Sequence, residues 1–405
     1  MKKTLFLCLI FFMAIVAKAQ PDQATTEFNK WTNLLDSGRR EASKSKDYPK
    51  CIELITRWVI RYDGLSAATQ RNFNGWKSGM YYNLACYYAL TGQKPMALES
   101  FNTAVASGYS DYADTMTDTD LTSLRDEPEF KNLLLTMREK GDYPYVLKIS
   151  GPYDRAATGL PAFTYQDASA PALVAFKNKY KLDSVAGTGD EISKFKNLLL
   201  WVHNAVRHDG NSNNPAQVNG DSLIMVCKAQ NRGVNCRMMA SILRDVYQAE
   251  GFKSRIVTCM PKDTLDNDCH VINVVWSNTL NKWVWMDPTF NAYLRDEKGN
   301  YLNIEEVRAR LISGRPVVLN DDANWNNQKK APAEYFSYMS KNLYWLKCSI
   351  KSEWDIESAK SGKPKIDYIN LYPGGYNTLH QPKMVNKQAV FYATNNPEYF
   401  WQKPE

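Results

Sequence analysis

The sequence predicts an α+β protein, in which an all-helical N-terminal region precedes a core built from a cysteine-bearing helix and an antiparallel sheet. Three observations predict this order. Apolar residues recur at helical spacing from about residue 27 to residue 138, and this periodicity stops in a stretch rich in Gly and Pro, residues 141–163. Residues 236–246 form an amphipathic helical pattern. Segments rich in Val, Ile and Trp follow that helix around polar turns, which is typical of strands.

The first residues of the chain have the pattern of a secretory signal peptide. Two lysines precede an apolar stretch, residues 5–16, and the small-residue pattern Ala17-Lys18-Ala19 follows it. The apolar stretch is too short to span a bilayer, and no later segment reaches the required length. We therefore expect residues 1–19 to be removed and the mature protein to be periplasmic or extracellular, with no membrane span. A lipid anchor is the weaker alternative, because no cysteine follows the cleavage site.

The composition and charge indicate a globular protein that does not bind nucleic acid. Of the 405 residues, 44% are hydrophobic and 23% are charged, which is ordinary for a globular chain. The formal net charge of +7 falls to +4 when the three lysines of the signal peptide are removed. So small a net charge, without a basic run interleaved with aromatic residues, does not indicate a nucleic-acid-binding protein.

The cysteine and histidine spacings give no metal or cofactor site. Eight cysteines become seven without the signal peptide, and an odd number in an exported protein leaves at least one thiol unpaired or paired between chains. No CxxC pair occurs, so neither a zinc ribbon nor a thioredoxin-type motif is predicted. His203 and His208 are five residues apart, which does not place them on one helical face. A disulfide between Cys259 and Cys269 stays open, because sequence does not fix connectivity.

The helical region, residues 20–144, contains one hairpin that resembles a tetratricopeptide repeat. Its small and aromatic residues fall at the repeat's packing positions, namely Leu84, Ala85, Tyr88, Ala97, Phe101 and Ala104. One repeat cannot bury its face alone, so we expect helices around 52–60 and 121–137 to cap it. A generic helical hairpin is the alternative. If the repeat is present, its surface is a candidate site for a protein partner.

The second domain is expected to begin near Pro144 and to cover residues 145–319. Two helical stretches, residues 171–182 and 191–210, precede a polar loop that leads to the cysteine helix. Residues 320–405 are aromatic and contain Pro-Gly turns, and we expect them to form a mostly β extension packed on this core.

Cys236 lies where a loop becomes a helix. An apolar stripe follows it at helical spacing, formed by Met239, Ile242, Leu243 and Val246. Unpaired backbone N–H groups and the positive end of the helix dipole lower the pKa of a thiol in the first turn. The structural alternative is a buried, inert cysteine, which is the interpretation that we prefer for Cys51 and Cys86.

A predicted hairpin, residues 268–290, brings a histidine and an aspartate together. If its turn is centred between Asn278 and Thr279, His270 stands opposite Asp287, with the Cβ atoms roughly 5 Å apart. A shift of the turn by one whole residue keeps both side chains on one face, whereas a half-residue shift separates them. The aspartate would fix the imidazole tautomer while the imidazole takes the proton of the Cys236 thiol.

These residues resemble the transglutaminase-like superfamily of papain-type cysteine enzymes, over about residues 198–290. The matching positions are Cys236, Ala240, Leu243-Arg244, the segment GFKSR that ends at Arg255, His270 at a strand start, and Asp287 in WVWMDPT. Two departures occur: Gly233 lies three residues before the cysteine instead of two, and Val271-Ile272 follow the histidine instead of Ala-Trp. The resemblance implies a papain-like core and the catalytic residues Cys236, His270 and Asp287.

The remaining candidates have weaker expectations. The backbone N–H of Cys236 is the natural first donor to an oxyanion, and Gln230 is a conceivable second donor. We expect His203 to have a packing or solvated role, His208 to be a partner of a helix dipole, and His380 to be structural. Cys269 should point away from His270, because neighbouring strand residues face opposite sides.

The sequence thus leads to two hypotheses of different classes. The first is an exported cysteine enzyme that acts on amide bonds of a protein or peptide substrate through a thioester on Cys236, by hydrolysis or by acyl transfer. The second is a scaffold that keeps the fold without turnover and binds a protein through its repeat-like helices. An open cleft above the Cys236 sulfur favours the enzyme, and a sulfur covered by side chains favours the scaffold.

Overall fold

The computed structural model describes residues 23–154, 159–266, 268–358, 364–376 and 383–405. The chain divides into two compact units, residues 1–141 and 142–405, and the division falls three residues before the predicted boundary at Pro144. The predicted signal peptide and His380 lie outside the described residues. Among the helices that are described, none is both long and apolar enough to cross a membrane.

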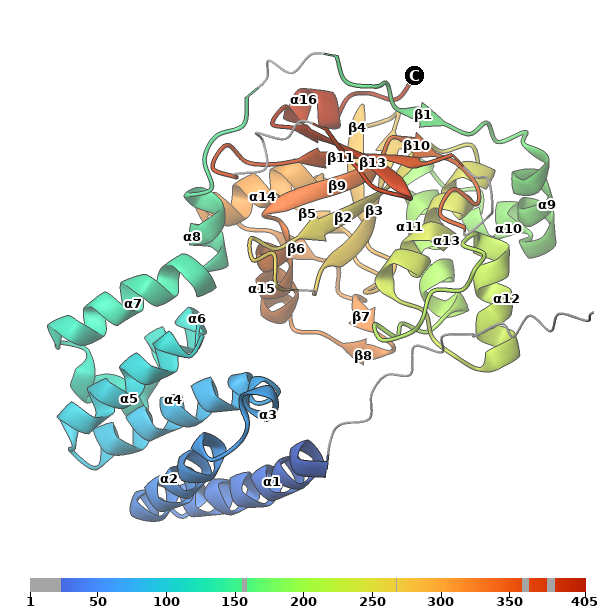
Figure 1. Ribbon diagram of the computed structural model, residues 1–405. Helices are drawn as coiled ribbons and strands as arrows, with labels where there is room; N and C mark the ends of the chain where they lie inside the picture. The colour runs from blue at the N-terminus through green and yellow to red at the C-terminus, as the bar shows by residue number, and fades with distance from the viewer. Residues whose placement is uncertain (1–22, 155–158, 267, 359–363, 377–382) are drawn as a thin grey trace, which may run out of the picture. The chain divides into compact units, whose positions relative to one another are not determined.

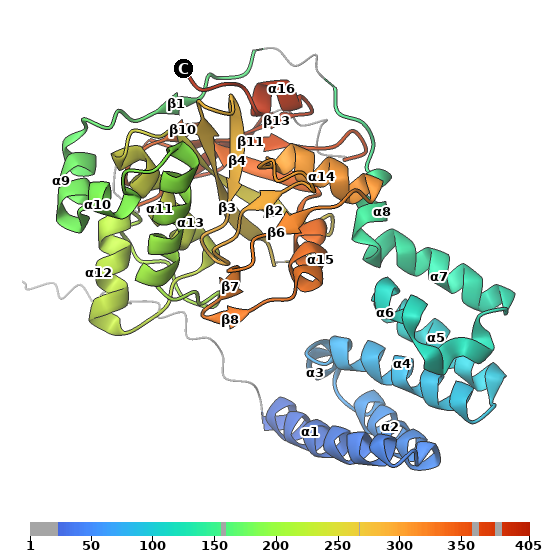
Figure 2. The same ribbon diagram turned by 180° about the vertical axis from the view of Figure 1, so that it is seen from behind.

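The first unit is helical in every described element (Figures 1 and 2). Its elements are α1 (Gln23–Lys44), α2 (Tyr48–Asp63), α3 (Ala67–Arg71), α4 (Asn74–Leu90), α5 (Lys94–Ala106), α6 (Tyr112–Thr117), the 3-10 helix η1 (Thr119–Leu124) and α7 (Pro128–Gly141). The predicted hairpin is formed by α4 and α5, with Gly92 at a φ of +76° in the turn between them. Ala97, Phe101 and Ala104 are fully buried, which lets the two helices approach closely. The helical hairpin is confirmed, while its assignment to the tetratricopeptide family stays a prediction.

The second unit contains a seven-stranded sheet, and the predicted α+β class is confirmed. Its order is β12-β13-β11-β9-β2-β3-β4, and the described pairs are antiparallel except β11 with β13. The strands are β2 (Ser254–Met260), β3 (His270–Ser277), β4 (Lys282–Met286), β9 (Trp345–Ser349), β11 (Ile366–Leu371), β12 (Lys383–Val385) and β13 (Ala389–Thr394). The shorter elements are α16 (Pro397–Phe400) and the strands β1 (Thr164–Tyr165), β5 (Leu294–Arg295), β6 (Val318–Leu319), β7 (Asn324–Trp325), β8 (Gln328–Lys329) and β10 (Lys351–Ser352).

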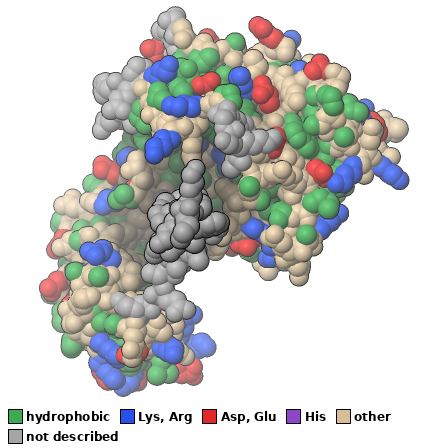
Figure 3. All heavy atoms as spheres, turned by 45° about the vertical axis from the view of Figure 1, so that its right-hand side comes forward, with side chains coloured by type: hydrophobic (Ala, Val, Ile, Leu, Met, Phe, Trp, Pro, Cys, Tyr) green, Lys and Arg blue, Asp and Glu red, His purple; other side chains and the backbone are tan. Residues whose placement is uncertain are grey.

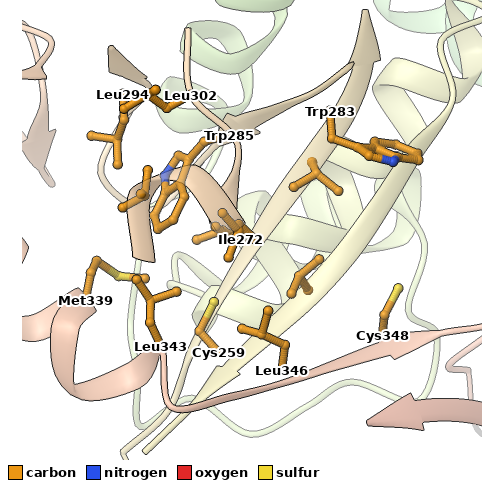
Figure 4. Packing of buried hydrophobic residues seen from close by; sticks show 14 of the residues in the cluster. Cys259, Ile272, Trp283, Trp285, Leu294, Leu302, Met339, Leu343, Leu346 and Cys348 are labelled. Atoms are coloured by element: carbon orange, nitrogen blue, oxygen red, sulfur yellow. The ribbon is translucent and has the colours of Figure 1, made fainter. Parts of the chain in front are cut away.

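Helices cover both faces of the central strands (Figures 1 and 2). One layer consists of α9 (Pro171–Tyr180), α10 (Leu182–Ala186), α11 (Glu191–Ala205), α12 (Gly220–Gln230) and α13 (Cys236–Ala249). The other consists of α8 (Tyr143–Lys148), α14 (Ile304–Ser313) and α15 (Pro332–Asn342). Figure 4 shows Met339 of α15, and Leu343 just after that helix, packed beside Cys259 and Ile272 of the sheet. Because helices cover both faces, nearly every residue of β2 and β3 is buried.

The C-terminal segment has a larger role than an extension packed on a finished core. Residues 320–405 supply β9, β11, β12 and β13, and β9 pairs directly with β2. The segment therefore completes the sheet on which the cysteine helix rests. Residues 320–405 were predicted to be a mostly β extension packed on the core, and their strands instead continue the core sheet. The pairing of strands far apart in sequence leaves no local pattern.

Candidate active site

Cys236 is the first residue of α13, as predicted. The helix begins there because the side chain of Asn235 accepts a hydrogen bond from the backbone N–H of Met238 at 3.1 Å. The apolar stripe of the helix is buried in the core, and Cys236 packs beside Ala240 and Val271. Cys236 itself is half-buried, so its sulfur lies at the border between the core and solvent.

His270 and Asp287 are hydrogen-bonded partners. The hairpin pairs Asn273 with Met286, so the turn centre lies one whole residue further along the chain than predicted. That shift keeps the two side chains on one face, and His270 Nε2 lies 2.8 Å from Asp287 Oδ2. Both residues are buried, with 2% and 0% of their surface exposed. The predicted contact between them is confirmed.

Asp287 is fixed from three directions. Its Oδ1 accepts the backbone N–H of Thr289 at 2.9 Å, and its Oδ2 accepts the Tyr335 hydroxyl at 3.0 Å. Its backbone N–H and C=O both pair with Ala292. A carboxylate held this way cannot rotate away from His270, so the hydrogen bond fixes the orientation of the imidazole.

The His270 ring is also confined by aromatic neighbours. Phe290 and Tyr338 each make an edge-to-face contact with it, at centroid distances of 5.5 and 5.4 Å. Because Nε2 is committed to Asp287, Nδ1 is the nitrogen that remains for Cys236. The site is therefore built for a defined imidazole tautomer.

The thiol and the imidazole carry shifted pKa values. Burial raises the pKa of Cys236, but hydrogen bonds from His208 and His270 and the nearby imidazoles outweigh burial and lower the pKa to about 6. Burial lowers the pKa of His270, but the charge and hydrogen bond of Asp287 outweigh it and raise the pKa to about 10. Between these values the pair is a thiolate and an imidazolium, which is the reactive form of a cysteine nucleophile.

His208 is a site residue that the sequence analysis missed. It was expected to interact with a helix dipole, but α11 ends at Ala205, and His208 instead forms a parallel bridge with Val234 just before Cys236. The indole N–H of Trp325 donates to His208 Nδ1 at 2.9 Å. An indole nitrogen only donates, so Nδ1 is an acceptor and the ring proton sits on Nε2. His208 therefore has an Nε2–H to offer, and its imidazole is one of the groups that lower the pKa of the Cys236 thiol.

His203 and Gln230, the other candidates from the sequence, do not line the cleft. His203 is buried, and its Nδ1 lies 2.9 Å from the carbonyl oxygen of Pro288, next to Asp287. Gln230 is exposed at the end of α12 and does not line the cleft, so the structure does not support it as an oxyanion donor.

The cysteines other than Cys236 do not compete with it as nucleophiles. All seven described cysteines are free, so the Cys259–Cys269 disulfide is not formed. Cys269 lines the cleft instead of facing away from it, because β3 begins only at His270 and strand alternation does not reach it. Burial raises the pKa of the Cys269 thiol, which leaves it protonated at neutral pH.

A cleft of about 1360 Å³ opens above the sulfur. Its lining includes Cys236, His270 and His208 on one side, and Lys347, Tyr368 and Phe391 from the C-terminal strands on another. The cysteine therefore faces an open space large enough for several residues of a peptide.

Metal-ligand geometry occurs elsewhere in the described part of the chain. Cys86, Asp118 and Asp120 of the first unit lie within ligand distance of one another. The Tyr82 hydroxyl donates to Asp118 at 2.7 Å and the Cys86 thiol donates to it at 3.6 Å, so hydrogen bonds within the unit already use this carboxylate.

Charged side chains of both signs are interspersed on the molecular face seen in Figure 3. This distribution agrees with the small net charge and gives no single-signed surface there.

Comparison with known proteins places a family domain over the site. Residues 178–288 match the model of the Transglutaminase-like superfamily, and this range contains Cys236, His270 and Asp287. A similar solved structure is that of a "Putative Cysteine Protease from Cytophaga hutchinsonii", at 18% identity and a TM-score of 0.22. The match covers 29% of this chain and 37% of that chain, so it spans well under half of that protein. No curated protein matches the sequence.

Proposed function

Because residues 178–288 form a transglutaminase-like domain, we propose that the protein is an exported cysteine enzyme that acts on amide bonds through a thioester on Cys236. The observation that carries the proposal is the Cys236 thiol at the floor of an open cleft, beside a His270 that is locked 2.8 Å from Asp287. Export rests on the signal-peptide pattern alone. We favour hydrolysis of a peptide or amide over transfer to another amine, because water is the most abundant acceptor.

The residues support a two-step acyl transfer. In the first step, the Cys236 thiolate attacks the carbonyl carbon, and the C=O electron pair moves onto oxygen. As that pair returns, the C–N bond breaks, the His270 imidazolium gives its proton to the leaving amine, and a thioester remains. In the second step, water attacks the thioester while His270 accepts its proton, and the C–S bond breaks to release the acid and restore the thiolate.

We assign two donors to the oxyanion that forms during the attack. The backbone N–H of Cys236 belongs to the first turn of α13, where N–H groups lack intrahelical partners, and no described residue outside the helix accepts it. The Nε2–H of His208 is the second donor, and Trp325 holds its tautomer. Donors preorganised in this way stabilise the tetrahedral intermediate more than they stabilise the substrate.

Replacing His208 with alanine is expected to lower turnover by roughly 10²- to 10³-fold, because one oxyanion donor is lost. Trp325→Phe removes only the indole N–H that fixes the tautomer, so its effect should be smaller and in the same direction. Steady-state turnover of a cleaved peptide measures both effects. Wild-type turnover in His208→Ala would remove His208 from the mechanism.

The proposed function is tested by the pH dependence of Cys236 alkylation. Because the pKa of Cys236 is lowered to about 6, its reaction with iodoacetamide should rise through pH 6 and level off near neutrality. Cys269 is the internal control, since it lines the same cleft and its pKa is raised. At pH 6.5 we expect Cys236 to react at least roughly tenfold faster than Cys269 or a model thiol, measured by mass spectrometry. Equal rates would contradict an activated thiolate and favour the scaffold.

The scaffold hypothesis predicts a different surface at the cysteine. A protein that only binds has no need of an accessible sulfur, and neighbouring side chains would be free to cover it. The half-buried Cys236 and the open cleft support the enzyme. The repeat-like helices stay a candidate site for a protein partner of that enzyme.

A further inference from the structure

The charged residues that line the cleft are unevenly matched. Each of its three carboxylates has a cation partner: Glu357 pairs with Arg237, Glu334 with Lys330, and Asp268 with Lys341. Three lining lysines have no ion pair or hydrogen bond through Nζ with any described residue, namely Lys347, Lys365 and Lys387. The internal segments outside the described residues contain no Asp or Glu. The cleft therefore has an excess of positive charge.

Lys347 differs from the other two lysines because it is half-buried. It lies on β9, and burial followed by the positive charge of Arg237 lowers the pKa of its ammonium group. Its described contact is with the Tyr368 ring, at 5.6 Å from the centroid. Glu357 attracts Lys347 but forms no direct ion pair with it, because Glu357 is bonded to Arg237. A partly desolvated cation without a direct counter-ion is costly unless something pairs with it.

Arg237 cannot replace Lys347 as a cation that binds an anion in the cleft. Its guanidinium already binds both oxygens of Glu357 and also donates to Thr258 Oγ1 at 3.0 Å and to the Tyr368 hydroxyl at 3.1 Å. These bonds use the guanidinium fork, and they anchor the first turn of α13 to β2 and β11. Lys347 is thus a half-buried cation of the cleft whose ammonium group forms no ion pair with a described residue.

The sheet register places Lys347 on the same face as the nucleophile. Val271, Thr258 and Lys347 are directly opposed on β3, β2 and β9, so their side chains share one face. Val271 packs against Cys236. Two strand spacings separate Val271 from Lys347, or roughly 10 Å between backbones, which a lysine side chain and two or three peptide residues bridge.

We propose that Lys347 is a carboxylate-binding subsite, so that the substrate of Cys236 carries a carboxylate within a few residues of the bond that is attacked. This inference rests on the proposed function and names its substrate class. The carboxylate is either the C-terminus of a short peptide or an Asp or Glu side chain.

A matched pair of alkylating probes tests the subsite without knowledge of the substrate. N-iodoacetyl-glycine and N-iodoacetyl-glycinamide have the same length and differ in the terminal carboxylate. Attack by the Cys236 sulfur forms a C–S bond and expels iodide in both cases. We expect the acid-to-amide rate ratio at Cys236, normalised to N-acetylcysteine, to be raised roughly tenfold in the wild type and lost in Lys347→Met.

Controls separate charge from folding and from the proposed function. Lys347→Arg keeps the positive charge and should keep the acid-to-amide preference. Lys228→Met removes an exposed lysine on α12 and should leave the preference unchanged. Added salt should weaken the preference. A wild-type ratio of one, or an unchanged ratio in Lys347→Met, would overturn the subsite. If the amide probe reacts no faster than it does with the model thiol, the activated thiolate fails, yet the acid-to-amide ratio still reports on Lys347. Peptides that end in a carboxylate or an amide, or that contain Asp or Asn, then identify the source of the charge.

Discussion

The variant Cys236→Ala is expected to lose turnover by a factor on the order of 10⁶ while it keeps its fold. In the proposed mechanism the Cys236 sulfur forms the thioester. Cys269, the other thiol in the cleft, does not replace it, because its raised pKa leaves it protonated. Cys236 is half-buried at the first turn of α13, so alanine leaves little cavity and fits a helix well. The melting temperature should therefore stay close to that of the wild type.

The measurement is a screen of peptides and glutamine amides against the wild type and Cys236→Ala, with products identified by mass spectrometry. Cys269→Ala is the matched control, since it removes a thiol from the same cleft and should leave turnover unchanged. Turnover that survives in Cys236→Ala would show that the chemistry does not pass through this sulfur. Mass spectrometry of a stalled reaction should also find the acyl group on Cys236 and not on Cys269.

Asp287→Asn is expected to lower turnover on the order of 10⁴-fold with little change in stability. Asparagine keeps an oxygen for the backbone N–H of Thr289 but presents an N–H₂ group where Oδ2 now faces His270. The imidazole must then accept at Nε2, which moves its proton to Nδ1. In that tautomer Nδ1 cannot take the proton of the Cys236 thiol.

Turnover, Cys236 alkylation at pH 6.5 and melting temperature should be measured side by side for Asp287→Asn. Tyr335→Phe is the control, because it removes the second partner of Oδ2 and leaves the tautomer of His270 unchanged. Unchanged melting with slow alkylation and lost turnover supports the triad. Unchanged alkylation and turnover would mean that Asp287 only shapes the turn before Pro288, and that Cys236 and His270 act as a dyad.

Local patterns predicted the parts of this site that depend on nearby sequence. The start of α13 was predicted from the apolar stripe that follows Cys236, which is readable within fifteen residues, and the structure adds the cap formed by Asn235. The contact of His270 with Asp287 survived an error of one residue in the turn, because side chains alternate with a period of two and a whole-residue shift preserves the face.

The parts that were missed depend on contacts between distant segments. His208 is set in place by a bridge to Val234 and by the indole of Trp325, which is 117 residues away. No periodicity links those positions, so the histidine resembled an ordinary residue after a helix. The pairing of β9 with β2 is equally remote in sequence, which is why residues 320–405 were predicted to be an extension packed on the core and not part of its sheet.

Residues 320–405 complete the sheet and are synthesised last, so the candidate site is assembled only after most of the chain has been made. The ribosome makes Cys236, His270 and Asp287 first. It makes Trp325, Tyr335 and β9, the strand that covers the edge of β2, afterwards. Until those residues emerge, β2 is an open sheet edge that is prone to pair with other chains. A nascent chain or a fragment that stops before residue 320 thus carries the thiol without the neighbours that align it. We therefore expect Cys236 to acquire its low pKa only after residues 320–405 have folded against β2 and His208.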